Sequence, residues 1–379
     1  MKIAIPKERR PGERRVAASP DVVKKLAALG LEVVVEAGAG EESAFADEAY
    51  RVSGAQIAPD ARATLGAADM IWKVRAPEAG EIAAMNKGAI LVAHMAALTD
   101  RAGVQACAEA GLTVFAMELM PRITRAQSMD VLSSQSNLAG YRAVIEAASE
   151  FGRGFPMMMT AAGTVAPAKV FVMGVGVAGL QAIATAKRMG AVVTAYDVRA
   201  ATKEQVESLG GKFVVVDAEA MKTAQTAGGY AKEMGEDYKK KEQEVIAEHV
   251  KKQDIVITTA LIPGKRAPVL VTEEMVRSLA PGSVIVDLAV EAGGNCAGAE
   301  ADKIVVKNGV KIVGYTNMPS RIAANSSALY ARNLLNFLTP MIDKQTKALA
   351  INWDDEIVKG TLVARDGRIV HPLLASGGT

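Results

Sequence analysis

Three glycines, Gly174, Gly176 and Gly179, stand between an apolar run that ends at Met173 and a stretch of helical character that continues to Met189. In a strand–turn–helix unit of this kind, the first glycine permits a tight turn, the second lets a ligand approach the backbone, and the third lets the helix pack closely on the strand. The unpaired N–H groups at the start of the helix favour an anion such as a pyrophosphate. Glycine-rich turns are common, so the spacing alone is weak evidence, but the flanking strand and helix indicate a dinucleotide site.

A carboxylate follows the next predicted strand. Asp197 comes directly after the apolar run Val192–Tyr196. In dinucleotide sites, an acidic residue typically follows the glycine motif by about 20 residues, and Asp197 has this spacing. A carboxylate there accepts hydrogen bonds from the adenosine ribose hydroxyls and repels a 2′-phosphate, which favours NAD(H) over NADP(H). Arg199 keeps the other choice open, because a nearby arginine can accommodate a 2′-phosphate. The predicted nucleotide contacts in this region of the chain are Gly174, Gly176, Val177, Ala178, Gly179, Asp197, Val198 and Arg199.

Two further segments follow predicted strands. Ligands of open α/β sheets bind at the carboxyl ends of parallel strands, and Thr259–Gly264 and Asp287–Glu291 occupy such positions. The backbone of the first segment, at Ala260 and Leu261, is a candidate contact for adenine and ribose. A purely structural turn is an equal alternative at both places, since every α/β protein has turns there.

These residues need a parallel sheet to bring them together, and the hydrophobic pattern predicts two. Short apolar runs alternate with amphipathic stretches, which is typical of β-α-β units. The expected strands of the first series are residues 2–5, 31–36, 69–74, 89–94 and 112–116. Those of the second series are residues 170–173, 192–196, 213–216, 255–258 and 284–288, with one or two more at 304–306 and 311–313. Ser19, Pro20 and Gly30 mark the ends of the first expected helix.

Long helices are expected over residues 131–151 and about 321–338, where apolar positions recur at helical spacing. The tail has turn chemistry at Arg365–Arg368 and is too short to be a domain, so we expect it to fold back onto the first domain. The segment Ala218–Lys252 is polar and long for a connection, which is typical of a mobile functional loop or a surface insertion.

The sequence therefore predicts an α/β protein of two doubly wound, Rossmann-like parallel-sheet domains, the second inserted in the first and joined to it by long helices. The first domain is expected to comprise residues 1–130 with 330–379, and the second, which binds the dinucleotide, residues 131–329.

Composition excludes several other classes of function. The net charge of +2 gives no electrostatic reason to bind nucleic acid or an anionic membrane surface. No run reaches the ~18 apolar residues of a membrane helix, and the N-terminus lacks the layout of a secretion signal. Cys107 and Cys296 stand far apart, which fits buried thiols in a reducing compartment. The three histidines, His94, His249 and His371, have no ligand spacing, so no metal site is predicted. We expect a cytoplasmic protein without a membrane segment of its own.

Several long strings resemble the proton-translocating nicotinamide nucleotide transhydrogenases. The strongest is Pro121–Arg142, which resembles a loop and helix of that family, and the others are Met159–Gly163, Gly228–Lys232, Thr258–Lys265 and Asp287–Cys296. The resemblance runs nearly the whole length of the chain and rests on unusual strings, so it is far more specific than the glycine motif. It implies the soluble NAD(H)-binding component, known as domain I and formed by the first section of the alpha subunit, which is a homodimer.

The resemblance also implies what that component does. Hydride passes directly between NAD(H) and NADP(H) held on a partner domain, in a Re/Si-specific enzyme that is active only with its NADP(H)-binding and membrane partners. The chain would then be peripheral on the inner face of the membrane. By motif, Arg122, Gln127 and Asp130 match residues of the family that contact the nicotinamide and its ribose, with Ser133 as a further polar contact. A solvated polar loop is the alternative interpretation of these four residues.

Three more residues take a role from the resemblance. Gly229 and Tyr230 belong to a mobile loop that closes over the bound nucleotide in the family, and Gln243, near the return of that loop, is a weaker candidate for a nucleotide contact.

Alanine dehydrogenases share this architecture and give the main alternative, a self-contained NAD-dependent enzyme. Arg15, Lys73 and His94 resemble their substrate pocket, with two cations that could hold a carboxylate and a histidine that could transfer a proton. Against this, Glu291 stands where those enzymes are expected to carry aspartate, and the Arg122–Tyr141 and Gly228–Tyr230 strings match transhydrogenases. A nucleotide sensor without catalysis is a third alternative.

Overall fold

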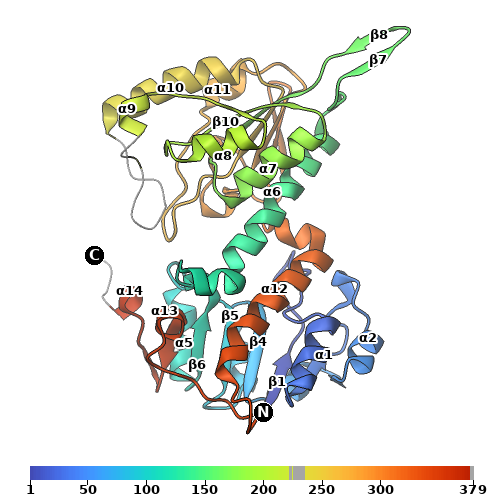
Figure 1. Ribbon diagram of the computed structural model, residues 1–379, viewed down its shortest axis with the longest axis vertical. Helices are drawn as coiled ribbons and strands as arrows, with labels where there is room; N and C mark the ends of the chain where they lie inside the picture. Colours follow the sequence, from blue (N-terminus) through green and yellow to red (C-terminus); the bar gives the residue numbers. More distant parts are fainter. Residues whose placement is uncertain (222–223, 225–234, 376–379) are drawn as a thin grey trace. The chain divides into compact units, whose positions relative to one another are not determined.

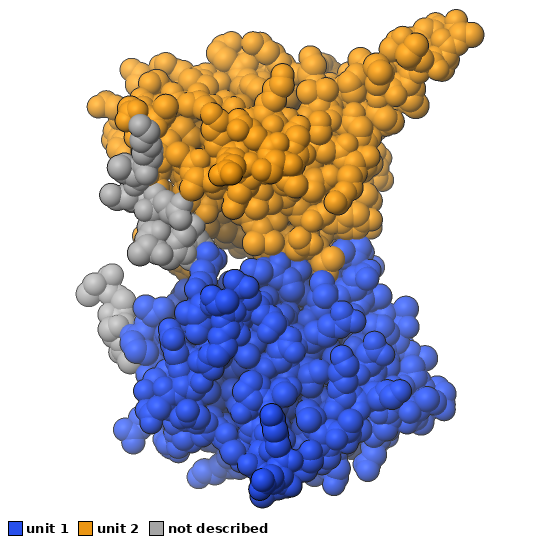
Figure 2. Space-filling model, viewed as in Figure 1, with its two compact units in different colours: residues 1–135, 319–379 blue, residues 136–318 orange. Residues whose placement is uncertain are grey.

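Two mainly parallel sheets organise the chain, whose computed structural model describes residues 1–221, 224 and 235–375 (Figure 1). The chain divides into unit 1, Met1–Gln135 with Pro319–Thr379, and unit 2, Ser136–Met318 (Figure 2). It leaves unit 1 within helix α6, Val131–Glu150, and returns at the short 3-10 helix η5, Met318–Ile322. Unit 2 is therefore an insertion in the sequence of unit 1.

Unit 1 contains an eight-stranded sheet in the order β17-β16-β6-β5-β4-β1-β2-β3. Its parallel strands are β1 (Lys2–Ile5), β2 (Glu32–Glu36), β3 (Gln56–Ala58), β4 (Met70–Arg75), β5 (Ile90–His94) and β6 (Thr113–Ala116). The predicted strands of the first series are confirmed, and β3 is an additional edge strand. Ile3 and Ile5 belong to one core cluster and Ala4 to another, so both faces of the sheet are covered.

Helices cover this sheet. They are α1 (Pro20–Ala28), α2 (Asp47–Val52), α3 (Ala61–Leu65), α4 (Ala79–Ala84), α5 (Arg101–Glu109), α12 (Ala323–Leu338), α13 (Glu356–Thr361) and α14 (Pro372–Ala375), with the 3-10 helices η1 (Glu41–Ser43), η2 (Met117–Leu119), η3 (Thr124–Met129) and η6 (Thr339–Met341). α1 begins as predicted, because the Ser19 side chain accepts the backbone N–H of Val22 and Pro20 occupies the first turn. α12 supplies Tyr330 and Leu334 to the core of unit 1.

The tail folds back onto the sheet of unit 1, as the sequence predicts. β16 (Leu362–Arg365) and β17 (Arg368–Ile369) form an antiparallel hairpin, and β16 also pairs with β6. The two residues of the turn, Asp366 and Gly367, both have positive φ, 53° and 77°, which is the conformation that Asp-Gly favours in a tight hairpin.

Unit 2 contains a seven-stranded sheet in the order β11-β10-β9-β12-β13-β15-β14. Its strands are β9 (Lys169–Met173), β10 (Val192–Tyr196), β11 (Lys212–Phe213), β12 (Ile255–Thr258), β13 (Val284–Asp287), β14 (Ile304–Lys307) and β15 (Val310–Val313), of which only β14 pairs antiparallel. The strand expected at 213–216 is shorter and begins one residue earlier, pairing at Lys212 and Phe213 with Thr194 and Ala195. The helices are α7 (Val177–Arg188), α8 (Thr202–Ser208), α9 (Ala218–Met221), α10 (Glu236–Val250) and α11 (Glu273–Ser278), with the 3-10 helix η4 (Val290–Ala292).

Two further features belong to unit 2. The polar segment Ala218–Lys252 contains α9 and α10. The Tyr196 hydroxyl of β10 donates a hydrogen bond to Oε1 of Glu242 on α10 at 2.6 Å. A hairpin of β7 (Met158–Thr160) and β8 (Gly163–Val165), whose residues are all exposed, extends from the unit (Figure 1). The sequence does not predict this hairpin.

Candidate dinucleotide-binding site

The strand order of unit 2 reverses at β9, which lies between β10 and β12. In open α/β sheets, such a reversal leaves a crevice at the carboxyl ends of the strands, and ligands bind there. Three predicted site segments begin at these ends: Gly174 after β9, Asp197 after β10 and Thr259 after β12. The fold therefore brings them to one edge of the sheet.

Each of the three glycines of the motif has a different conformation or environment. Gly174 has a φ of +94°, which side chains disfavour, and an added Cβ would lie 2.7 Å from Oγ1 of Thr259. An added Cβ at Gly179 would lie 1.9 Å from the carbonyl oxygen of Gly174, so only glycine lets α7 pack this closely on the turn. At Gly176 an added Cβ would meet no atom of the described residues within 4 Å. The space beside Gly176 is thus open, at the N-terminus of α7, where it fits a pyrophosphate.

Asp197 is held by donors from the glycine loop and from its own loop after β10. The carboxylate is 6% exposed and accepts the backbone N–H of Val175, within the glycine loop, at 2.8 Å. It also accepts the backbone N–H of Arg199 at 2.9 Å and two N–H groups of the Arg199 guanidinium, from Nε at 2.8 Å and Nη2 at 2.7 Å. The carboxylate that the sequence predicts as a ribose contact thus already carries an arginine partner.

The loop after β12 is held by a residue that the sequence pattern does not single out. Asn295 is fully buried, and its side-chain amide donates to the carbonyl oxygens of Ala260 and Pro268 at 2.9 and 2.8 Å. Its own backbone N–H donates to Asp287 at 2.7 Å. Burial raises the pKa of Asp287, and backbone N–H groups oppose that rise by donating to it. Asn295 lies within the Asp287–Cys296 string, but no periodic or spacing signal in the sequence singles it out.

Helix α6 lies against the glycine loop at Gly140. An added Cβ at Gly140 would lie 2.0 Å from the carbonyl oxygen of Ala178, in the first turn of α7. One turn earlier, the side-chain amide of Asn137 donates to Gln181 of α7 at 3.1 Å. Gly140 thus allows two helices to approach backbone to backbone beside the predicted phosphate position.

The four residues expected at the nicotinamide end, Arg122, Gln127, Asp130 and Ser133, lie in unit 1 around η3 and the start of α6. Asp130 caps α6, because its two oxygens accept the backbone N–H of Ser133 at 3.0 Å and the Ser133 hydroxyl at 2.6 Å. Arg122 and Gln127 are exposed. These four residues therefore belong to unit 1, where only Asp130 and Ser133 are shown in contact, and the glycine loop, Asp197, Val198, Arg199, Ala260 and Leu261 belong to unit 2.

The remaining candidates are Gly229, Tyr230 and Gln243. Gln243 is exposed on α10. Gly229 and Tyr230 lie outside the described residues. Across residues 1–221, 224 and 235–375, no group of three or more histidine, cysteine, aspartate or glutamate side chains is placed to hold a metal ion.

Unit 1 has a strand-order reversal of its own, between β1 and β4, and buried charges gather near it. Arg15 donates to Glu13 from Nε at 2.8 Å and from Nη2 at 2.7 Å, and Nη1 donates to Gln135 at 2.8 Å. Lys73 is 1% exposed and pairs with Glu81 at 2.8 Å and with Glu8 at 3.3 Å. The two cations that could hold a substrate carboxylate are therefore engaged by carboxylates of the chain.

His94 lies near this cluster, at the end of β5. Its Nδ1 atom is buried and has no hydrogen-bond partner among the described residues. Burial lowers the pKa of His94, although Glu118 opposes the change.

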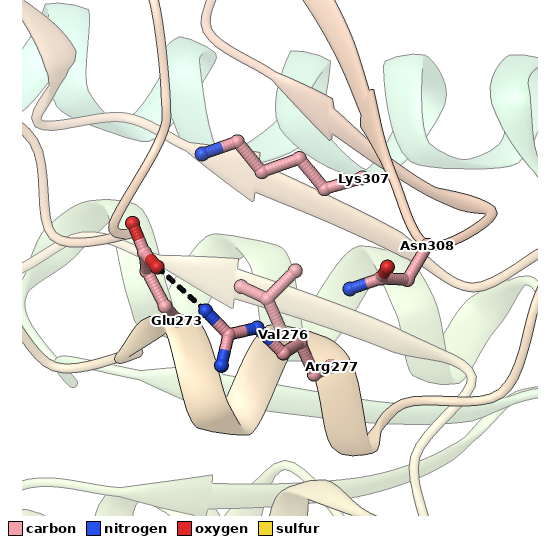
Figure 3. Close-up of a pocket in the computed structure, with 5 residues that line it drawn as sticks. All are labelled: Glu273, Val276, Arg277, Lys307 and Asn308. Carbon is pink, nitrogen blue, oxygen red and sulfur yellow. Dashed lines mark hydrogen bonds and ion pairs between the residues drawn. The ribbon is translucent and has the colours of Figure 1, made fainter.

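A separate pocket of about 210 Å³ lies between α11 and the turn that joins β14 to β15 (Figure 3). It is lined by Glu273, Val276, Arg277, Lys307 and Asn308. Arg277 is paired with Glu273 at 2.9 Å, as the dashed line in Figure 3 marks. The pocket shares no residue with the glycine loop or the segments around Asp197 and Ala260.

Comparisons with known proteins agree with this arrangement. Residues 4–139 match the family described as alanine dehydrogenase/PNT, N-terminal domain, and residues 143–372 match alanine dehydrogenase/PNT, C-terminal domain. The chain is 66% identical to the first section of NAD(P) transhydrogenase subunit alpha of Rhodospirillum rubrum, over 100% of both chains. The crystal structure of transhydrogenase from Sinorhizobium meliloti superposes with a TM-score of 0.86 at 53% identity and covers 98% of this chain and 99% of that one.

Alanine dehydrogenases are more distant relatives. The enzyme of Halomonas elongata is 30% identical over 99% of this chain and 96% of its own length. The alanine dehydrogenase covers nearly the whole chain, but its identity is less than half of that of the transhydrogenase subunit. The two groups of enzymes therefore share the fold and differ in sequence. The chain belongs to the alanine dehydrogenase/PNT family, and within it to the NAD(P) transhydrogenase alpha subunits.

Proposed function

We propose that this chain binds NAD(H) and exchanges a hydride with NADP(H) held on a partner domain, as the NAD(H)-binding component of a proton-translocating transhydrogenase. The observation that carries the proposal is the 66% identity, over the full length of both chains, to the Rhodospirillum rubrum transhydrogenase polypeptide. The crevice at β9 supports it, because its open glycine turn and strand-end carboxylate suit a dinucleotide.

The residues of unit 2 bind and orient the adenosine half. The N–H groups at the start of α7 face the open space at Gly176 and favour the pyrophosphate. Asp197 accepts the ribose hydroxyls and disfavours a 2′-phosphate, which selects NAD(H). The backbone of Ala260, which Asn295 holds, borders the adenine and ribose together with that of Leu261.

The residues of unit 1 orient the reactive half. A bound nicotinamide supplies the hydride chemistry, so the protein needs no acid or base at the carbon, only correct placement and exclusion of water. Gln127 can hydrogen-bond the carboxamide, and Arg122 can respond to the change of charge between the oxidised and reduced forms. Asp130 contributes a carboxylate whose position is fixed by Ser133.

The partners are the NADP(H)-binding domain and the membrane subunit, with the chain as a homodimer at the inner face of the membrane. This aspect rests on the resemblance to transhydrogenases and on the name of the Rhodospirillum rubrum relative, which is one section of a subunit called alpha. No helix among the described residues combines the length and the hydrophobicity that a bilayer crossing requires. Sedimentation of the purified chain measures whether it is a dimer.

Alanine dehydrogenase is the second candidate, because Arg15, Lys73 and His94 lie near the strand-order reversal of unit 1. The pairing of Arg15 with Glu13 and of Lys73 with Glu81 counts against it, since a substrate carboxylate would have to compete with groups already in place. Burial lowers the pKa of Lys73, but Glu8 and Glu81 outweigh burial and raise it, so Lys73 stays charged and paired.

Two assays on the purified protein test the proposal. NADH fluorescence titration is expected to show binding, and absence of binding would contradict the proposal. Pyruvate and ammonium are expected to cause no NADH oxidation, whereas hydride transfer to an NADP⁺ analogue is expected once an NADP(H)-binding domain of a related transhydrogenase is added. Turnover with pyruvate and ammonium would make the chain an alanine dehydrogenase.

A further inference from the structure

The carboxylate of Asp197 is fully used as an acceptor. An ionised carboxylate offers about four lone-pair positions, two on each oxygen. Oδ1 accepts the backbone N–H and the Nε–H of Arg199. Oδ2 accepts the backbone N–H of Val175 and an Nη2–H of Arg199. Two of these donors are fixed in the backbone, and the other two belong to one guanidinium.

The two N–H donors of the Arg199 side chain occupy the positions that two ribose O–H donors would need. The backbone donors leave one lone-pair position on each oxygen of Asp197, and the guanidinium fills both with a parallel pair of N–H groups. A vicinal diol offers two O–H donors on neighbouring carbons to the same two oxygens. Arg199 and the ribose diol therefore need the same positions and cannot hold them together.

The guanidinium is well held where it lies. Its Nη2 atom is 3.3 Å from the carbonyl oxygen of Val175, so Arg199 joins the strand end to the glycine loop. The side chain of Arg199 is 17% exposed, and that of Asp197 is 6% exposed. Hydrogen bonding to Asp197 raises the pKa of Arg199, which keeps the cation charged. Displacing Arg199 thus breaks a partly buried ion pair, which costs free energy unless new donors reach Asp197.

We infer that Arg199 determines nucleotide specificity by competing with the ribose diol for Asp197, an inference that rests on the proposed binding of NAD(H). While Arg199 lies on Asp197, the acceptor positions are closed. Once Arg199 is displaced, Asp197 can accept a ribose diol, and the released guanidinium is a cation that can balance a 2′-phosphate. Arg199 therefore lowers the affinity for NAD(H) and raises the affinity for NADP(H).

The test is the affinity of Arg199→Met for NADH and for NADPH, measured by calorimetry on the purified chain. Methionine keeps most of the volume and removes the competing donors and the charge. NADH is expected to bind more tightly by several-fold to on the order of tenfold, and NADPH to bind more weakly. The free variant is expected to unfold at a lower temperature than wild type, since Asp197 loses its partner, and saturating NADH is expected to narrow that difference.

A second variant distinguishes the effect of the two parallel N–H donors of Arg199 from the effect of its positive charge. It also tests the inference if the methionine variant folds poorly. Arg199→Lys keeps the cation but cannot donate two parallel N–H groups. It is expected to gain affinity for NADH and to keep that of wild type for NADPH. Arg277→Met serves as the matched control, because Arg277 is exposed, pairs with Glu273 in the same unit and lies apart from Asp197, so both affinities are expected to stay unchanged.

The outcomes are distinct. If both Arg199 variants bind NADH more weakly than wild type, Arg199 is a direct contact of the nucleotide and the inference is overturned. If wild type itself binds no NADH, the proposed function fails, whatever the variants do.

Discussion

Asn295 and Ala260 are joined by two hydrogen bonds that run in opposite directions. The backbone N–H of Ala260 donates to Oδ1 of Asn295 at 3.0 Å, and Nδ2 of Asn295 donates to the carbonyl oxygen of Ala260 at 2.9 Å. A side-chain amide here imitates the pairing of a neighbouring strand, just beyond the point where β12 ends. The loop that borders the proposed adenine position is thereby held without a strand of its own.

Replacing Asn295 by alanine is expected to release this loop. Three hydrogen bonds are lost, and the half-buried backbone groups of Ala260 and Pro268 lose these partners, so the free energy of unfolding should fall by about 2 to 4 kcal/mol. NADH affinity should fall as well, because the loop must be ordered on binding. Circular dichroism melts and NADH titration measure the two effects. Asn86→Ala, on an exposed asparagine, should change neither.

Replacing Gly140 by alanine is expected to push α6 away from the glycine loop. A methyl group 2.0 Å from the carbonyl oxygen of Ala178 cannot be accommodated by side-chain movement alone, so the helix must shift at a cost of about 1 to 3 kcal/mol. Gly80→Ala is the matched control, since Gly80 is also helical and an added Cβ meets no atom of the described residues within 4 Å. That control should be neutral or slightly stabilising. Equal melting temperatures for the two variants would contradict the close approach at Gly140.

Replacing Asp197 by alanine should weaken NADH binding by roughly 1.5 to 3 kcal/mol, which is typical of a lost charge-assisted hydrogen bond. Calorimetric titration measures this directly. Affinity equal to that of wild type would remove Asp197 from the proposed site.

Replacing Gln127 by asparagine should slow hydride transfer and leave NADH affinity nearly unchanged. The shorter side chain keeps its amide but moves it by one methylene, which disturbs ring placement more than it removes contacts. Single-turnover transfer to an NADP(H)-binding domain measures the rate, and fluorescence titration measures the affinity. A parallel loss of both quantities would contradict the positioning role.

Glu13 gives unit 1 a pH-dependent contribution to stability. Burial alone would raise its pKa, but Arg15 and Arg75 outweigh burial and lower the pKa from 4.5 to about 2. A carboxylate with a lowered pKa in the folded state stabilises the fold above pH 4.5, and this stabilisation is lost as the pH falls toward 2. The contribution at neutral pH is on the order of 3 kcal/mol.

Glu13→Gln should therefore lower the stability of unit 1 strongly at pH 7 and much less near pH 3. Both tryptophans, Trp72 and Trp353, lie in unit 1, so their fluorescence in urea follows that unit. Glu42→Gln removes an exposed pair with Arg14 and should cost under about 1 kcal/mol at either pH. If Glu13→Gln lowered the stability of unit 1 by the same amount at pH 7 and pH 3, the lowered pKa of Glu13 would be contradicted.

Much of the fold can be predicted because its signals are local. The cap at Ser19, the Asp366-Gly367 turn and the apolar runs of both sheets each depend on residues close in sequence. The glycine motif can be predicted for the same reason, since Gly174, Gly176 and Gly179 form one strand–turn–helix unit.

Other elements of the site depend on contacts between residues far apart in the chain. Asn295 acts on Ala260, and Gly140 acts on Ala178, and neither relation leaves a periodic or spacing signal. The sequence predicts that Arg199 lies near a 2′-phosphate position. Its two hydrogen bonds to Asp197 are seen only in the three-dimensional structure. The roles of Arg122, Gln127, Asp130 and Ser133 stay predictions that rest on resemblance.

The insertion of unit 2 in the sequence of unit 1 also sets an order of maturation. All seven strands of the unit 2 sheet have left the ribosome once residue 313 emerges, whereas unit 1 still lacks α12, β16 and β17. Since α12 carries Tyr330 and Leu334 into the core of unit 1, the N-terminal portion of that unit must remain incomplete during synthesis of the whole insert. The domain that begins second is thus the first that can fold to completion on the nascent chain.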